Sequence, residues 1–202
     1  MKPNEADGKT SRSSRSKPPK DNRTLIIAFD TASNDTGVAI KFDDGSPVKD
    51  GTYLTYGEIA ESSEKIETRC GSLHVRVCAL LDRYLRDADE KRYKVVIVME
   101  QARQGQFRNV YAALRAAQSA IWCAAFERDL PIRYVAPVQI RAALNLKTGA
   151  SKEEIADEVK KLFSLPKELS DNITDAIGIA EAFSRGWKMK RVVKKIERRK
   201  TT

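Results

Sequence analysis

The stretch Thr24–Thr31 reads TLIIAFDT, a compact run of apolar and β-branched residues. Such a run is typical of a strand that is buried in a sheet. One charged residue, Asp30, lies near its end. Burying a carboxylate costs free energy unless the group is paired or binds a metal ion. The stretch therefore predicts both the core of a sheet and a candidate functional carboxylate at the end of its strand.

The rest of the chain predicts the element order β-β-β-α-β-α-β-α-α. Alternating or continuous apolar residues indicate the strands, and apolar residues at three- and four-residue steps indicate the helices. Ser151 and Glu154 form a capping-box pattern. Further strands are expected at Thr36–Phe42, Gly51–Gly57, Lys94–Glu100 and Arg133–Ala136, and helices at about 60–90, 106–129, 152–163 and 171–185. We expect an α/β fold with a central mixed five-stranded sheet flanked by helices.

The net charge of +9 lies in the two ends of the chain. Residues 1–23 hold seven Lys or Arg and three Asp or Glu, and residues 185–202 hold nine and one. We expect a basic, disordered N-terminal tail (1–23), one globular domain (24–185) and a basic C-terminal tail (186–202). Nucleic acid is the polyanion that such tails favour, although tails that only aid solubility have the same composition.

The cysteines and the single histidine argue against several kinds of site. Three cysteines without paired spacing favour a reducing, intracellular setting, and the chain has no apolar run of the roughly 20 residues that a membrane span needs. His74, the single histidine, has no convincing partners for a His-based triad. Cys70, Cys78 and Cys123 show no zinc-ligand spacing.

The carboxylates indicate a function more strongly than the cysteines and the histidine do. Glu100 ends its strand as Asp30 does, and Asp175 lies on the last helix, away from that helix's apolar stripe. Asp171 lies one helical turn before Asp175. Three or four carboxylates on adjacent elements form an oxygen-rich cage for Mg²⁺ or Mn²⁺, and two such ions can assist phosphodiester hydrolysis. Taken singly, each residue could instead be a turn, cap or surface charge; together the set is unusual.

Four segments carry a resemblance. Ile27–Gly37 (IAFDTASNDTG) has an aspartate at the end of a strand and a Thr-Gly pair that begins the next. Val95–Gln101 (VVIVMEQ) is a strand that ends in Glu-Gln, and Asp175–Ala180 (DAIGIA) is an Asp-Ala helix motif. Pro137–Arg141 and Thr148–Lys152 form a basic segment between them. In this order, over about residues 25–184, they resemble the motifs of RuvC-type Holliday junction resolvases, members of the ribonuclease H-like superfamily.

The resemblance implies a ribonuclease H-like fold, a homodimer, and paired symmetric nicks in a four-way or other branched DNA. It implies that Asp30, Glu100 and Asp175 bind the catalytic metal, which we expect to be two Mg²⁺ or Mn²⁺ ions per site. Phe107 is the candidate aromatic that probes the junction, with a core role at a helix start as the equal alternative. The residues expected to contact DNA are Arg103, Phe107, Arg108, Arg141, Lys147 and Lys152.

The chain departs from the family at Asn172, where a carboxylate or histidine often lies three residues before the last aspartate. We expect Asp171 to complete the metal site, directly or through water, with Asn172 outside the ligand shell. Two other functions stay open: a non-catalytic nucleic-acid-binding protein of the same superfamily, or an ATPase-like domain, although the chain is short for a duplicated ATPase. For the dimer contact we expect either the helix with Leu73, Val77 and Leu81 or the helix at 106–129.

Overall fold

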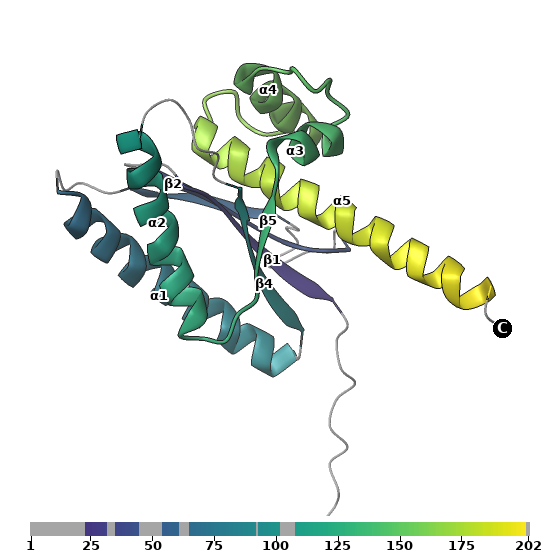
Figure 1. The fold of residues 1–202 in the computed structure, drawn as a ribbon, viewed down its shortest axis with the longest axis horizontal. Coiled ribbons are helices and arrows are strands. Elements are labelled where there is room, and N and C mark those ends of the chain that lie inside the picture. Colours follow the sequence, from purple (N-terminus) through teal and green to yellow (C-terminus); the bar gives the residue numbers. More distant parts are fainter. Residues whose placement is uncertain are drawn as a thin grey trace, which may run out of the picture.

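The protein, described by a computed structural model over residues 23–31, 35–44, 54–60, 65–91, 93–101 and 108–200, is a mixed sheet between two helical layers (Figure 1). The sheet has five strands in the order β3-β2-β1-β4-β5. The first three strands are antiparallel, and β4 and β5 run parallel to β1. The strands are β1 (Thr24–Thr31), β2 (Asp35–Phe42), β3 (Leu54–Ala60), β4 (Lys94–Glu100) and β5 (Ile132–Val135).

Helices cover both faces of this sheet. One face packs against the first two helices and the other against the last three, as Figure 1 shows. The helices are α1 (Ile66–Lys91), α2 (Arg108–Phe126), α3 (Pro137–Ala143), α4 (Lys152–Phe163) and α5 (Asp171–Lys200). None of the helices within the described ranges is long and apolar enough to cross a bilayer.

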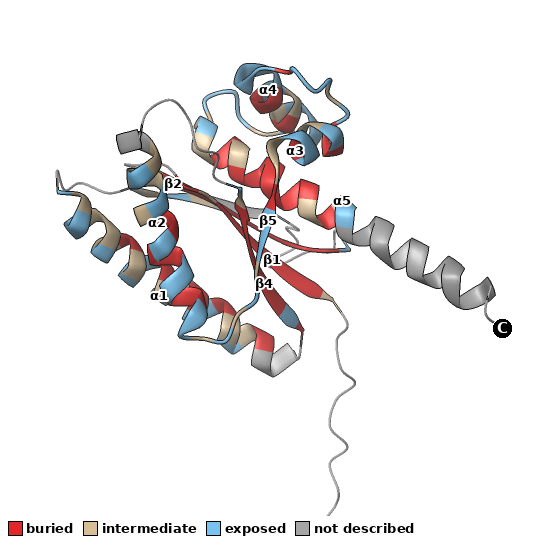
Figure 2. Cartoon of the chain, viewed as in Figure 1, coloured by how far each residue is buried: buried red, intermediate tan, exposed pale blue. Residues whose placement is uncertain are grey.

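Strand β1 is apolar on both faces because both faces are covered. Successive side chains of a strand point to opposite sides. Leu25, Ile27 and Phe29 therefore enter the core under α1 and α2, whereas Ile26 and Ala28 enter the core under α5. All five are fully buried, and Figure 2 shows the central strands as the most buried part of the molecule. The hydrophobic burial on both sides makes β1 the centre of the fold.

A buried ion pair fixes α5 against β2. Lys41 extends from β2, and its Nζ lies 2.5 Å from Oε2 of Glu181 on α5, with both side chains at most one-tenth exposed. Arg185 donates a second hydrogen bond to Glu181 at 2.6 Å. Burial alone would raise the pKa of Glu181, but the charges and hydrogen bonds of Lys41 and Arg185 outweigh it and lower this pKa below its ordinary 4.5. The Lys41–Glu181 ion pair therefore stabilises the position of α5 at pH values above about 4.5.

Most expected elements are confirmed, with shifts at their ends. Strands β1 and β4 have the expected bounds. The third strand, expected at Gly51–Gly57, continues to Ala60 because its pairing with β2 runs to Asp35; residues 51–53 lie outside the described part. Helix α3 was not expected, although its first residue, Pro137, is typical of a helix start.

The last helix was expected to end near residue 185, but α5 continues to Lys200. Residues 1–22, where the N-terminal tail is expected, lie outside the described residues, as do the side chains from 187 onward. The division into one domain and two basic tails therefore stays a prediction.

Candidate functional site

Two carboxylates end adjacent parallel strands. The register pairs Phe29 of β1 with Met99 of β4, so the next residues, Asp30 and Glu100, lie at the same edge of the sheet. Each follows a residue of the core under α5, Ala28 or Val98, by two positions. Both side chains therefore point to the α5 face. The carboxyl ends of parallel strands are where α/β sheets commonly bind their ligands.

Helix α5 adds a third carboxylate, Asp175. The turn that carries it packs on the sheet through Ile173, Ala176 and Ile177, which are all buried. The side chain of Asp175 is only 14% exposed and lies close enough to Asp30 for their charges to interact. The structure thus brings together the three residues Asp30, Glu100 and Asp175 from β1, β4 and α5.

The electrostatics of this carboxylate cluster are unfavourable without a cation. Burial raises the pKa of Asp30 from its ordinary 3.8 to about 7, and the negative charges of Asp175 and Glu100 add to the rise. Burial also raises the pKa of Asp175. Buried like charges of this kind favour either protonation or a bound cation.

Lys152 supplies one positive charge to the cluster. It is the first residue of α4, held in place by the capping box of Ser151 and Glu154 that the sequence predicts. Its Nζ lies 3.5 Å from Oδ2 of Asp175, and the charge of Asp175 raises the pKa of Lys152. Sequence reasoning expected this lysine on DNA and did not connect it with the carboxylates. With a side chain 78% exposed, it can also reach outward from the cluster.

Asp171 and Asn172 are neighbours in the first turn of α5, but their side chains have different surroundings. Ser170 is the helix cap, since its Oγ accepts a hydrogen bond from Ile173 N at 3.5 Å. Asp171 is exposed, and its charge contributes to the raised pKa of Asp175. Asn172 instead donates to Oε1 of Glu58 on β3 at 2.9 Å. Asp171 therefore lies beside the cluster without a described contact to Asp30 or Glu100.

A glycine lets α5 approach the sheet at this point. Gly37 pairs with Asp30 across β1 and β2, and with Glu58 across β2 and β3. A Cβ at position 37 would lie 1.8 Å from the backbone oxygen of Asn172. No side chain fits in that space, so the Thr-Gly pair seen in the sequence is what allows the start of α5 to lie over Asp30. Sequence reasoning noted this glycine only as part of a motif.

Gln118 fixes the end of β4 from the sheet face that α1 and α2 cover. This buried α2 residue donates its Nε2 to the backbone oxygen of Glu100 at 3.1 Å. Arg115 in turn donates to Oε1 of Gln118 at 3.0 Å. A polar residue within the apolar face of α2 was the available sequence signal, and it was missed.

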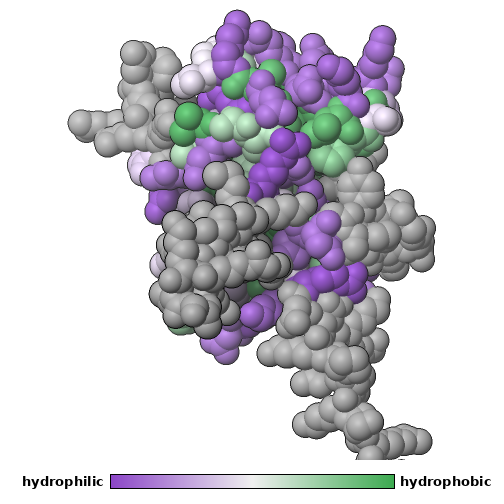
Figure 3. All heavy atoms as spheres, turned by 90° about the vertical axis from the view of Figure 1, so that its right-hand side faces the viewer, coloured by the Kyte–Doolittle hydropathy of each residue, from purple (hydrophilic) through white to green (hydrophobic). Residues whose placement is uncertain are grey.

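The residues expected on DNA are spread more widely. Arg141 donates its Nε to the backbone oxygen of Ala150 at 2.9 Å, so it braces the loop before α4. Lys147 is exposed in that loop, 3.6 Å from Glu154. Arg103 and Phe107 lie outside the described residues, as does the side chain of Arg108. In Figure 3 the upper part of the surface, over α3 and α4, mixes hydrophilic side chains with hydrophobic ones.

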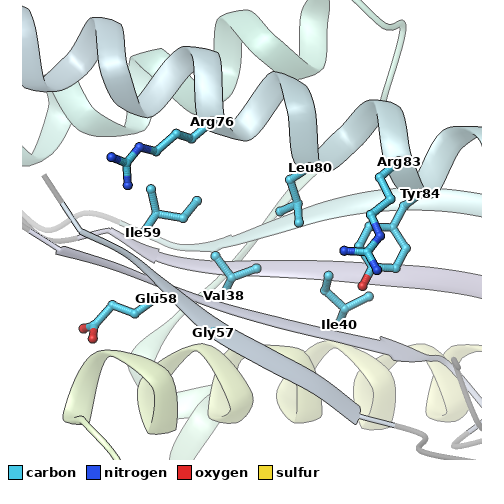
Figure 4. A pocket seen from close by; sticks show the side chains of 9 residues that line it. All are labelled: Val38, Ile40, Gly57, Glu58, Ile59, Arg76, Leu80, Arg83 and Tyr84. Carbon is cyan, nitrogen blue, oxygen red and sulfur yellow. The ribbon is translucent and has the colours of Figure 1, made fainter. Parts of the chain in front are cut away.

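A cavity of about 220 Å³ lies elsewhere, between α1 and strands β2 and β3. Figure 4 shows its apolar lining, which includes Ile40 and Leu80, with Arg76 and Arg83 reaching over it from α1. Ile40 belongs to the core under α1 and α2. The cavity is therefore on the sheet face opposite the carboxylate cluster and is separate from it.

Comparison with known proteins identifies relatives. Residues 26–183 match the sequence model of the family described as crossover junction endodeoxyribonuclease RuvC. The RuvC protein of Thermus thermophilus is 32% identical over 137 residues, which cover 64% of this chain and 76% of that protein. The RuvC protein of Bacteroides fragilis is 32% identical over 126 residues, which cover 60% of this chain and 61% of that protein.

Solved structures share the fold. The structure of T. thermophilus RuvC in complex with Holliday junction substrate aligns with a TM-score of 0.64 at 21% identity, covering 82% of this chain and 96% of that one. A second T. thermophilus RuvC structure aligns with a TM-score of 0.62 over the same shares. The likeness confirms the ribonuclease H-like fold with a mixed five-stranded sheet.

The close approach at Gly37 generates the first testable prediction. Gly37→Ala should lower the free energy of unfolding by at least about 1–3 kcal/mol, because the added methyl group overpacks the contact between β2 and α5. Urea unfolding followed by circular dichroism measures the change. Gly57→Ala is the matched control: it lies on neighbouring β3, and its Cβ would meet nothing within 4 Å. Equal stability of the two variants would contradict the role assigned to Gly37.

Proposed function

This chain belongs to the RuvC family of crossover junction endodeoxyribonucleases, and we propose that it cleaves four-way DNA junctions at Asp30, Glu100 and Asp175. One observation carries the assignment of the site. Carboxylates from β1, β4 and α5 gather at one end of the sheet, and burial and like charge raise the pKa of Asp30 among them to about 7, so the site favours a cation. Carboxylate oxygens are the ligands that Mg²⁺ and Mn²⁺ prefer.

The arrangement of the ligands suits a pair of divalent ions. Asp30 interacts electrostatically with both Asp175 and Glu100, so it would hold a cation together with either of them. Bound there, two divalent ions would supply stabilisation of the attacking and leaving oxygens of the phosphodiester. Asp171, exposed one turn before Asp175, is the candidate fourth ligand, directly or through water.

Lys152 has a distinct part in this proposal. In the metal-free protein its ammonium group forms an ion pair with the carboxylate of Asp175. This side chain is 78% exposed, so with the carboxylate charge balanced by bound cations it would be free to bind a phosphate of the DNA. A positive charge placed where negative charge develops lowers the barrier to phosphoryl chemistry. The proposal thus makes Lys152 a phosphate-positioning residue, while Arg141 shapes the loop that leads to it.

We also propose a homodimer, because a four-way junction has two symmetric strands to cut. Two helices are candidates for the dimer contact. Helix α1 cannot make this contact through Leu73, Val77 and Leu81, because these residues are buried in the protein's own core. Helix α2 presents Trp122 and Phe126, one turn apart and 56% and 80% exposed. Large exposed aromatics in such an arrangement are typical of interface cores.

The exposed aromatic side chains of α2 lie close to the sheet edge. Trp122 and Tyr134 line one pocket together with the polar residues Arg115, Gln118 and Ser119, and Tyr134 lies on the edge strand β5. Edge strands that are exposed tend to be covered by a partner or protected by charge. The α2 face, made by Trp122, Phe126 and Tyr134, is therefore the proposed contact between the two copies.

The two alternative functions have less support. A non-catalytic binding protein has no need of three carboxylates whose burial is costly. An ATPase-like domain is disfavoured by the family match across residues 26–183. The basic ends of the chain fit the nuclease, since Lys and Arg add salt-dependent affinity for DNA without selecting its sequence. A junction substrate also favours a location inside the cell, in the cytoplasm or nucleoid.

The metal proposal predicts the effect of removing single carboxylates. Asp30→Asn, Glu100→Gln and Asp175→Asn should each lower cleavage of a labelled four-way junction more than about 100-fold, since even groups outside the ligand shell cost about 10–100-fold. Junction binding should persist, because negative charge near phosphate is removed. Gel assays of binding and of cleavage in Mg²⁺ measure both.

Two further variants test whether Asp171 is the fourth ligand. Asp171→Asn should cost activity and raise the Mg²⁺ requirement, whereas Asn172→Ala should cost less, because its amide already bonds Glu58. Cleavage by the parent protein in excess EDTA would overturn the metal assignment. Parent-like cleavage by Asp171→Asn, with Asp175→Asn inactive, would leave a site of three carboxylates.

The dimer proposal predicts the effect of making the α2 face polar. The double variant Trp122→Ser, Phe126→Ser should be monomeric in light scattering and should lose paired nicking, because the apolar area that holds the dimer is gone. Val75→Ser is the control, since Val75 is 66% exposed but lies on α1. A parent protein that is monomeric both alone and with junction would refute the proposal.

A further inference from the structure

A second group of potential metal ligands lies between α1 and α2. His74 and Cys78 are one turn apart on α1, and Glu127 directly follows α2. His74 Nε2 lies 3.5 Å from Cys78 Sγ and 3.3 Å from Glu127 Oε1. Cys78 Sγ lies 3.8 Å from Glu127 Oε2. Among the described residues, these three form the group whose ligand atoms all lie within 4.8 Å of one another.

The histidine ring is oriented as a metal ligand. Its Nδ1 lies 3.1 Å from the backbone oxygen of Ala120, an atom that can only accept a hydrogen bond. Nδ1 therefore carries the proton, and the lone pair of Nε2 faces Cys78 and Glu127. Metal-binding histidines commonly donate their other ring N–H to a carbonyl or carboxylate in this way.

We propose that His74, Cys78 and Glu127 form a zinc site that joins α1 to α2. A tetrahedral Zn²⁺ with Zn–N and Zn–O bonds of about 2.0–2.1 Å and a Zn–S bond of about 2.3 Å needs ligand atoms about 3.3–3.6 Å apart. The separations of His74 Nε2 from Glu127 Oε1, 3.3 Å, and from Cys78 Sγ, 3.5 Å, match these values. One ligand atom from each of the three residues lies within 4.8 Å of the other two, so small side-chain shifts would complete the set. Glu127 is half exposed, so water can take the fourth position.

The charges around the group balance with zinc bound. A Cys78 thiolate and the Glu127 carboxylate offset the two positive charges of Zn²⁺. The neighbouring guanidinium of Arg128 is already paired with Asp82 through bonds of 2.7 and 3.1 Å. Its Nη1 also lies 3.3 Å from Cys78 Sγ and 3.3 Å from Glu127 Oε2, so it can donate to both anionic ligands. Arg128 therefore supports the anionic ligands without leaving an excess positive charge.

The zinc site is separate from the nuclease centre. α1 and α2 cover the sheet face opposite the carboxylate cluster. Its ligand set also differs in kind, since a thiolate and an imidazole favour Zn²⁺ over Mg²⁺.

Titration of the full-length protein with Co²⁺ tests this site, with excess Mg²⁺ present to occupy the carboxylate cluster. Co²⁺ substitutes for Zn²⁺ and gives an absorption band in the near ultraviolet when a thiolate binds it. The parent should show this band, and Zn²⁺ should abolish it by competition. Cys78→Ser should lack the band, and Cys123→Ser, whose thiol is exposed on α2, should keep it.

Two further variants and one further readout complete the test. Glu127→Gln, an exposed change that leaves the core intact, and His74→Gln should each weaken Zn²⁺ binding at least about tenfold. Zn²⁺ should raise the Tm of the parent and of Cys123→Ser but not of Cys78→Ser, because a ligand that binds the folded state stabilises it. Absence of the band in the parent, its survival in Cys78→Ser, or parent-like Zn²⁺ affinity in Glu127→Gln would overturn the proposal.

Discussion

The backbone oxygen of Asn172 occupies the space that a Cβ at position 37 would fill, so α5 can cross the sheet here only over a glycine. Gly37 is the β2 partner of Asp30, so the contact brings the first turns of α5 over the end of β1. The Lys41–Glu181 pair holds the same helix farther along. With α5 fixed at both points, Asp175 lies beside Asp30 and Glu100. The site is thus a product of backbone packing more than of any contact among its carboxylates.

This geometry costs stability in the absence of metal. The pKa of Asp30 in the folded protein, about 7, is above its ordinary 3.8. A carboxyl group with a raised folded pKa contributes stability at low pH and loses it as the pH rises from about 3.8 to 7. Lys152 offsets part of this cost through Asp175. Divalent cations would offset the rest, so the groups that destabilise the free protein are those suited to its chemistry.

Features that depend on local pattern could be predicted from the sequence. The bounds of β1 and β4, the capping box at Ser151, and the three strand and helix carboxylates all come from hydrophobic period and spacing. Contacts between distant segments could not be predicted in this way. Examples are Gln118 beneath Glu100, Asn172 on Glu58, and the meeting of His74 and Cys78 with Glu127, for which sequence reasoning found no partner. Each depends on how a helix lies on the sheet or on a neighbouring helix.

The approach of α5 at Gly37 brings Asp175 to Asp30 and Glu100, and the proposed divalent metal site depends on this approach. Calorimetric titration of Mn²⁺ into Gly37→Ala tests it most directly, because this variant keeps every carboxylate. Mn²⁺ should bind at least about tenfold more weakly than to the parent, since displaced ligands lose the geometry that metal binding needs. Gly57→Ala should bind like the parent. Parent-like Mn²⁺ affinity in Gly37→Ala would contradict the account.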